Sequence, residues 1–301
     1  MNIFSKTSTA FLSLALSLGL VSCNDNRLVV PDKRSIESAR VGVNDITPTM
    51  PKYYKLSKYG DDNLTYYPDG RLKRVMDGPD VRGSLASRTE YSYSPGIIKA
   101  LTYSGTSLIV DQTYLVDVKT NRCYEFNELW YIYSNSDQTR QRNLVFTYTD
   151  KGQLKTCSEK QSPQERTEYT YNADGDVIKA VSYGAPQFAY SPIALDETTF
   201  AYDQPAGDPI LTDLHAMNSD WITLPNYYLP IFGKLSKHLV KLTINKPLVI
   251  KPYLDVIQHY YTYTLNADGY VTDRNTYSVS GGALLKTDSY KYLVTPVTVQ
   301  Q

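Results

Sequence analysis

Five short segments of the chain repeat one pattern, and this pattern limits the fold more than any other feature of the sequence. Each segment places tyrosines or other apolar residues at alternate positions, runs through a short polar stretch to a glycine, and resumes with Leu, Ile or Val. The segments span residues 64–72, 91–98, 146–154, 169–177 and 263–271. Alternation with a period of two is typical of a β-strand, and the glycine is typical of a tight turn with a positive φ. Each segment therefore predicts a β-hairpin.

A single hairpin cannot bury its own apolar face, so the repeats must pack beside one another. We expect one all-β domain over residues 52–301, built as a long antiparallel meander whose sheet is strongly curled or closed into a barrel. Curling removes the exposed edges that so many strands otherwise present. The sequence leaves open whether the sheet closes completely.

Residues 184–252 interrupt the hairpin rhythm. Eight of the sixteen prolines fall in this range, which predicts an irregular insertion that plugs or caps the sheet. Within residues 234–242, three leucines recur at helical spacing and three lysines occupy the opposite face. This pattern predicts a short amphipathic helix in the insertion.

The composition supports a tyrosine-rich sheet and excludes one class of partner. The chain has 28 Tyr against 7 Phe and 2 Trp, and tyrosine suits half-buried strands because its ring packs while its hydroxyl reaches water. Lys and Arg together number 31, as do Asp and Glu, so the net charge is zero. Without a basic field, no nucleic-acid partner is expected.

The N-terminal residues carry a targeting signal. Residues 1–22 are predicted to be a signal peptide. They contain an uncharged apolar run that is too short to span a bilayer. The run ends in Leu-Val-Ser-Cys23, which resembles the lipobox that the lipoprotein signal peptidase recognises. That resemblance implies cleavage before Cys23 and lipidation of its thiol, which anchors the chain permanently in a membrane. Residues 23–51 are polar, contain three prolines and predict a tether.

The hairpins also carry a family resemblance. They resemble the tyrosine–aspartate (YD) repeats of the Rhs family. A closer resemblance is to uncharacterised Bacteroidetes-type lipoproteins that combine a lipobox, a short tether, such hairpins and a late Phe-Gly-Lys-x-Ser-Lys segment, here residues 232–237. This resemblance implies an outer-membrane lipoprotein of the cell envelope with no assigned activity. A single acidic residue, Asp25, lies directly after the lipobox region, so the periplasmic face and the cell surface both stay open.

Two further cysteines, Cys123 and Cys157, fall in predicted strands. Outside the cytoplasm they either form a disulfide or remain as partly buried thiols, and their number and spacing exclude a zinc knuckle. The three histidines lie more than twenty residues apart, so no metal site is expected. No phosphate loop, dinucleotide fingerprint or nucleophile elbow is present, so no cofactor and no catalytic residue are predicted.

The candidate contact residues are aromatic. Trp130 stands in one dense cluster of large rings, and Trp221 stands near Tyr227 and Tyr228 in another. Such rings stack on sugars and dominate protein interfaces, although packing between sheet and insertion explains them as well. The leading hypothesis is a non-enzymatic scaffold that binds a ligand, a glycan or an envelope protein. The alternatives are a purely structural or assembly role, and a carbohydrate-active enzyme, which requires two carboxylates about 5–9 Å apart.

Overall fold

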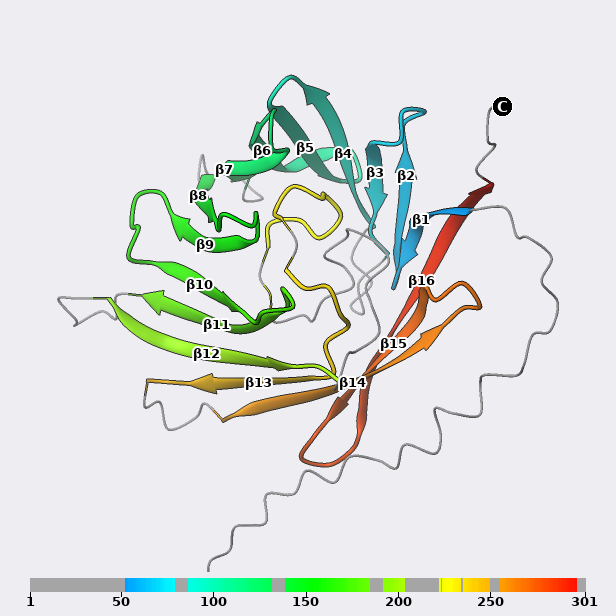
Figure 1. Cartoon of the computed structure of the whole chain (residues 1–301). Coiled ribbons are helices and arrows are strands. Elements are labelled where there is room, and N and C mark those ends of the chain that lie inside the picture. The colour runs from blue at the N-terminus through cyan, green and yellow to red at the C-terminus, as the bar shows by residue number, and fades with distance from the viewer. Residues whose placement is uncertain are drawn as a thin grey trace, which may run out of the picture. The chain divides into compact units, whose positions relative to one another are not determined.

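Consecutive antiparallel strands form a closed barrel in the part of the chain that the computed structural model describes (Figure 1). Those residues are 52–78, 86–131, 139–184, 192–203, 222, 224–233, 235–249 and 255–296, within one compact unit of residues 50–301. Each strand pairs with its neighbours in sequence, and the first strand closes the ring on the last, where Lys52 lies opposite Pro296. The structure therefore confirms the all-β meander and shows that the sheet closes.

The described strands are β1 (Lys52–Tyr59), β2 (Asp62–Tyr66), β3 (Leu72–Met76), β4 (Ser87–Ser94), β5 (Ile97–Ser104), β6 (Ser107–Asp117), β7 (Arg122–Tyr131), β8 (Thr139–Tyr148), β9 (Leu154–Glu159), β10 (Arg166–Tyr171), β11 (Val177–Gly184), β12 (Ile193–Ala201), β13 (Leu242–Pro247), β14 (Ile257–Leu265), β15 (Val271–Ser278) and β16 (Leu284–Pro296).

The repeated segments form the hairpins that the sequence predicts, and their turns all lie at one end of the barrel. The turns follow the even-numbered strands β2, β4, β8, β10 and β14, which run in the same direction because every pairing is antiparallel. Their glycines take the left-handed conformation: Gly70, Gly96, Gly152, Gly175 and Gly269 have φ values of 88°, 73°, 78°, 94° and 85°. We call this end the turn end, and the opposite end, where the odd-numbered strands finish, the loop end.

Tyrosine hydroxyls tie each hairpin to the one before it. At the turn end, a tyrosine side chain donates a hydrogen bond to a backbone carbonyl in the preceding strand or directly before that strand. The pairs are Tyr66–Leu56, Tyr93–Leu72, Tyr148–Cys123, Tyr171–Leu154, Tyr202–Val177, Tyr263–Val240 and Tyr292–Val271, at 2.5–2.8 Å. The turns shift the strand register at this point, so the hydroxyls satisfy carbonyls beside the irregularity. These seven tyrosines thus have a specific structural role.

The two faces of the barrel wall differ sharply in polarity. One row across β5 to β8 places Ile98, Tyr114, Phe126 and Leu144 side by side, and each is at least 92 % buried. The next row, one residue along each strand, is Lys99, Thr113, Asn127 and Asn143. Because side chains alternate across a strand, the first row points into the barrel and the second points outward. The apolar core therefore lies inside the ring.

A segment between β12 and β13 fills part of the ring. Side chains of the strands alone fill barrels of about eight strands, and wider barrels leave an open interior. Figure 1 shows the yellow segment lying within the ring of strands. We call its described residues (222, 224–233 and 235–240) the plug. Its buried apolar side chains are Ile222, Leu224, Leu229, Ile231, Phe232, Leu235, Leu239 and Val240.

Two predictions from the sequence about the plug region are wrong. No helix is present in the described part of residues 234–242, because the barrel takes the hydrogen-bonding groups that a helix needs. Asp176 accepts hydrogen bonds from the backbone N–H of Lys237 (2.7 Å) and His238 (2.9 Å), and the carbonyl of Leu235 accepts from Val177 N–H (2.9 Å). The predicted insertion of residues 184–252 is also too long, because β12 and β13 lie inside that range.

Candidate ligand-binding site at the turn end

A cavity of about 760 Å³ lies between the plug and strands β1 to β6 at the turn end. Its volume falls in the range of small-molecule sites, roughly 300–1,000 Å³. We call it the turn-end pocket. Tyrosine rings supply much of its lining, together with a few polar groups at its mouth. The tyrosines are Tyr53, Tyr54, Tyr66, Tyr93, Tyr228 and Tyr270, and the polar residues include Lys55, Asp69, Arg71, Ser94 and Asn121.

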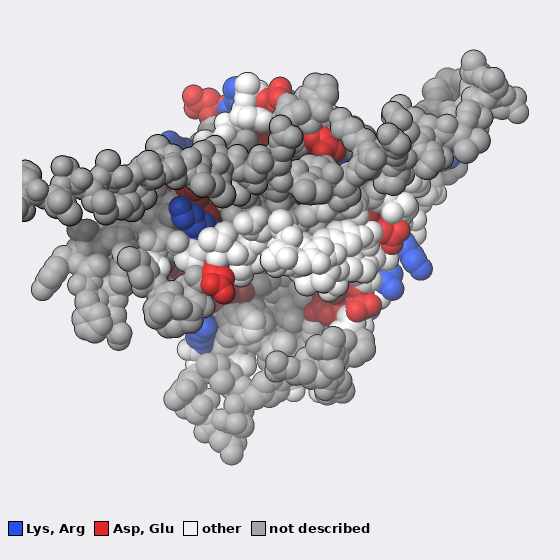
Figure 2. Space-filling view, turned by 90° about the horizontal axis from the view of Figure 1, so that it is seen from below, with Lys and Arg blue, Asp and Glu red and all other residues white. Residues whose placement is uncertain are grey.

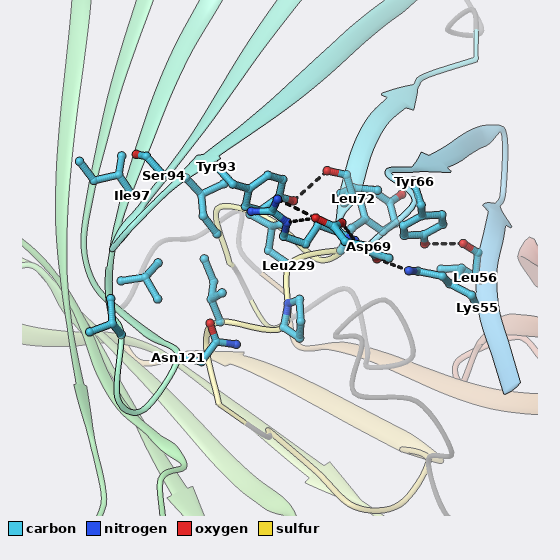
Figure 3. Close-up of a pocket in the computed structure, with 18 of the residues that line it drawn as sticks. Lys55, Leu56, Tyr66, Asp69, Leu72, Tyr93, Ser94, Ile97, Asn121 and Leu229 are labelled. Atoms are coloured by element: carbon cyan, nitrogen blue, oxygen red, sulfur yellow. Dashed lines mark hydrogen bonds and ion pairs between the residues drawn. The ribbon is translucent and has the colours of Figure 1, made fainter. Parts of the chain in front are cut away.

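The β2–β3 turn holds an arginine across one tyrosine ring at the mouth. Asp69 accepts hydrogen bonds from the Arg71 backbone N–H (2.9 Å) and from its Nε (2.7 Å), which fixes the guanidinium. The guanidinium carbon lies 4.6 Å from the centre of the Tyr93 ring, a cation–π contact. Figure 3 shows Tyr93 between Asp69 and Ser94, with its hydroxyl bonded to Leu72. The pocket thus has a charged, preorganised group stacked on an aromatic wall.

The ionisation states of the lining follow from these contacts. Hydrogen bonds from Arg71 lower the pKa of Asp69, so its carboxylate is charged at neutral pH. Burial raises the pKa values of Tyr66 and Tyr93, so both phenols are neutral. Burial also lowers the pKa of Lys55, whose ammonium donates to the Gly70 carbonyl. The pocket therefore combines neutral tyrosine rings with an Asp–Arg pair.

The plug forms the floor of the pocket through an ordered turn. The Asn226 side chain donates to the Tyr91 hydroxyl (2.8 Å) and accepts from the backbone N–H groups of Tyr228 (2.8 Å) and Leu229 (3.0 Å). The Tyr228 hydroxyl donates to Asp62 at 2.5 Å, and burial raises the pKa of that carboxyl. These contacts place Tyr228, Leu229 and Pro230 against the cavity.

The loop end has a different interior. The inner row beyond Tyr91 and Ala100 continues with Gln112, Glu128 and Arg142. Gln112 donates to Glu128 at 2.7 Å. On the other side of the ring, Arg274 and Asp288 form a fully buried ion pair at 2.8 Å. Polar side chains there bond to one another, as buried polar groups must.

The structure separates the aromatic residues that the sequence grouped as contact candidates. Tyr228 lines the turn-end pocket, and Tyr227 is half-buried against the core. Trp130 lies near the opposite end of the barrel, where β7 runs toward the loop end, and is 44 % exposed. Trp221 lies outside the described residues. Only Tyr228 of the described candidates therefore belongs to the pocket.

The two cysteines are free thiols in the structure. Cys123 lies in β7 and is buried, and Cys157 lies in β9 and is half-buried. Strand β8 runs between them, so their Cα atoms are separated by two strand spacings, about 9–10 Å. A disulfide requires Cα atoms within about 7 Å, so the pairing that the sequence left open is not made. Burial raises the pKa of both thiols to about 12.

The residues that sequence reasoning missed are Asp69, Arg71 and Tyr93. All three lie inside recognised repeats, but the repeats were interpreted only as hairpins. The pairing of β3 with β4 brings the first repeat's turn beside the second repeat's strand, and this pairing places Arg71 on Tyr93. A basic residue directly after the Asp-Gly turn was the available signal.

The described residues offer neither a metal-binding cluster nor a membrane-spanning helix. They contain no group of three or more His, Cys, Asp or Glu side chains arranged to hold a metal ion. Among them, no helix is long and apolar enough to cross a membrane.

The described strands form a closed antiparallel β-barrel, and its apolar core includes the plug. This fold agrees with that of a known protein family. A family described as "Domain of unknown function (DUF4595) with porin-like fold" matches residues 64–273. The chain belongs to this family. It matches no curated protein sequence.

Two similar solved structures are porin-like proteins of low sequence identity. One from Bacteroides vulgatus ATCC 8482 has a TM-score of 0.52 and 12 % identity, over 78 % of this chain and 97 % of that one. Another from Bacteroides uniformis ATCC 8492 has a TM-score of 0.47 and 15 % identity, over 83 % of this chain and 94 % of that one. The first likeness supports the fold alone.

Proposed function

We propose that this chain is a non-enzymatic binding protein of the bacterial envelope, anchored by lipid at Cys23, whose turn-end pocket holds a saccharide. The observation that carries the proposal is the cavity of about 760 Å³ walled by tyrosine rings, with Arg71 and Asp69 fixed at its mouth. A sugar ring offers apolar C–H faces and hydroxyl edges. Tyrosine faces match the former, and charged or amide side chains match the latter.

Binding fits the pocket better than glycoside hydrolysis does. Hydrolysis needs one carboxyl whose pKa is raised, so that it can act as an acid, and a second carboxylate about 5–9 Å away. Asp69 is the carboxylate among the described lining residues, and Arg71 lowers its pKa. Its charge state is therefore the opposite of a general acid's.

The chain enters the barrel at the turn end, the end that carries the pocket. Strand β1 begins at Lys52 on the turn end, so the tether of residues 23–51 joins the barrel there.

Outward positions such as Lys99, Thr113 and Asn127 are polar or charged. They support a barrel that stands in water beside the outer membrane while Cys23 holds it there. Figure 2 shows one side of the barrel with acidic and basic groups scattered around an uncharged centre. We further propose that the hairpins are degenerate relatives of YD repeats.

The binding proposal is tested on the mature chain, residues 23–301, with a glycan array and calorimetry of the best-binding oligosaccharide. The matched variants are Arg71→Ala and Arg88→Ala, because each arginine stacks on a tyrosine, at 4.6 Å and 4.5 Å, and only Arg71 lines the pocket. We expect Arg71→Ala to weaken binding about tenfold, or about 1.4 kcal/mol, and Arg88→Ala to leave it unchanged. A blank array, or equal effects of the two variants, overturns the proposal.

The anchoring proposal has its own test. Cells labelled with a palmitate analogue should incorporate the label into the wild-type chain and not into Cys23→Ala, and the variant should leave the membrane fraction. A Cys23→Ala chain that stays in the membrane fraction contradicts lipid anchoring.

A further inference from the structure

A second cavity, of about 600 Å³, lies beside the turn-end pocket. The turns after β6, β8 and β10 form one side, and the plug forms the other. It shares Asn121 and Pro230 with the turn-end pocket, so the two cavities adjoin. We call the second cavity the basic pocket, because Arg122, Lys151 and Lys237 line it.

These three cations have no carboxylate partner among the described residues. Elsewhere on the barrel, Arg71, Arg142 and Arg166 each face a carboxylate at 2.6–2.9 Å. The described lining of the basic pocket contains one acidic residue, Asp174, which leaves a formal charge of +2 from three cations and one anion. Like charges that share a cavity repel one another, and a bound anion relieves that repulsion.

The repeat glycines make room for these cations. A side chain at Gly152 would collide with the Arg122 guanidinium, and a Cβ at Gly175 would lie 3.2 Å from Cε of Lys237. The guanidinium also lies 5.6 Å from the centre of the Tyr148 ring. Asp176 fixes the backbone of Lys237 by accepting its N–H at 2.7 Å. The Arg122 and Lys237 side chains therefore pack closely against the repeat turns.

We propose that the basic pocket receives an oxyanion, a carboxylate or a sulfate, carried by the saccharide in the turn-end pocket, so the ligand is an acidic oligosaccharide. This inference rests on the proposed function, because the sugar rings occupy the adjoining cavity. Arg122 supplies the planar fork that binds an oxyanion through two parallel hydrogen bonds. Lys151 and Lys237 add point charges from two other segments.

The first arm of the test asks whether the anion site exists by itself. Inorganic sulfate is titrated into the isotope-labelled mature chain at low ionic strength, where screening is weak, and the amide signals of Gly152, Gly175 and Lys237 are followed by NMR. We expect saturable shifts that the double variant Lys151→Gln/Lys237→Gln abolishes. Lys99→Gln/Lys155→Gln removes the same charge from exposed wall positions outside the pocket, and should shift like the wild type. Unsaturable shifts, or equal shifts in both double variants, overturn the inference.

The second arm separates this inference from the proposed function. Acidic oligosaccharides are compared with neutral partners of the same backbone, such as oligogalacturonates and their methyl esters. We expect acidic forms to bind at least about tenfold more tightly, and Lys151→Gln/Lys237→Gln to remove the preference without weakening the neutral form. Equal binding of acidic and neutral forms overturns the inference and leaves the proposed function standing. Sulfate binding without any saccharide binding overturns the proposed function and the acidic-saccharide assignment together.

Discussion

The two ends of the barrel are built from the same strands and yet have opposite interiors. Along the inner face of β7, Cys123 and Phe126 are apolar and buried near the turn end, whereas Glu128 and Trp130 follow toward the loop end. At the turn end, tyrosine hydroxyls bond to the strand backbone, and the plug packs into the interior beside the turn-end pocket. At the loop end, ion pairs and amide contacts occupy the inner rows. The difference shows how a wide barrel stabilises its interior: an inserted segment packs into the apolar core at one end, and paired polar groups line the other.

The largest expected effect on stability comes from truncating a buried side chain of the plug. Phe232 is fully buried and packs on Phe146 and Tyr114. Phe232→Ala should lower the free energy of unfolding by about 4 kcal/mol, because a large cavity opens in a packed core. Trp130→Ala, an exposed aromatic near the other end, should cost less than about 1 kcal/mol. Urea unfolding of both variants checks the comparison, and equal losses would contradict the assignment of the core to the turn end.

The attachment of the plug gives the next largest effect. Asp176 is buried and accepts hydrogen bonds from Lys237, His238 and the His238 ring. Asp176→Ala should cost about 3 kcal/mol, because hydrogen bonds to a charged acceptor are worth about 1.5–3 kcal/mol each and do not add fully. Asp174→Ala, two residues earlier and exposed, should cost less than about 0.5 kcal/mol. Chemical denaturation measures both, and a costly Asp174→Ala would show that the turn itself, rather than the plug contact, is stabilising.

Removing one of the hydrogen-bonded tyrosine hydroxyls should have a smaller effect on the free energy of unfolding. Tyr171→Phe removes the hydrogen bond to the Leu154 carbonyl and should cost about 1 kcal/mol. Tyr183 has its ring on Arg166 at 4.3 Å and no described hydroxyl bond, so Tyr183→Phe should change the unfolding free energy by no more than about 0.3 kcal/mol. Matching losses in the two variants would remove the structural explanation for the tyrosine content.

The smallest expected effects are on the pH dependence of stability, and they have opposite signs for Asp176 and Asp62. Burial raises the pKa of Asp176, but hydrogen bonds from His238 and Lys237 outweigh it, so the net shift is downward. Its contribution is present above the unfolded pKa of about 4 and is lost as the pH falls through the lower folded pKa. The pKa of Asp62 is raised by burial, so protonation of Asp62 favours the folded state as the pH falls. Acid should therefore destabilise Asp176→Asn less steeply than the wild type, and Asp62→Asn more steeply. Unfolding curves from pH 7 to pH 3 test both slopes, and parallel curves would contradict both assignments.

The sequence predicted the local part of this fold because local chemistry determines it. The alternating tyrosines and the turn glycine of each repeat lie within about nine residues of sequence. Gly70, Gly175 and Gly269 take the predicted positive φ. Closure of the ring depends on the pairing of Lys52 with Pro296, which no local pattern contains. The repeats required a curled sheet but could not specify the contact that closes it.

The candidate site was predicted less well, because it arises from contacts between distant segments. The leucine spacing in residues 234–242 is helical, but the acceptor that captures the backbone, Asp176, lies about sixty residues earlier. Arg71 meets Tyr93 only after β3 pairs with β4. Tyr228 was identified as a contact candidate and does line the pocket, whereas Trp130 lies toward the loop end.

Hydrogen–deuterium exchange of the mature chain, with and without the oligosaccharide that binds best on the array, tests most directly which end of the barrel is the binding end. We expect added protection in the turns at residues 67–72, 94–98 and 118–122 and in plug residues 228–231, with none at the loop-end turns 104–107 and 160–165. Added protection at the loop end, with the turn end unchanged, would contradict this expectation.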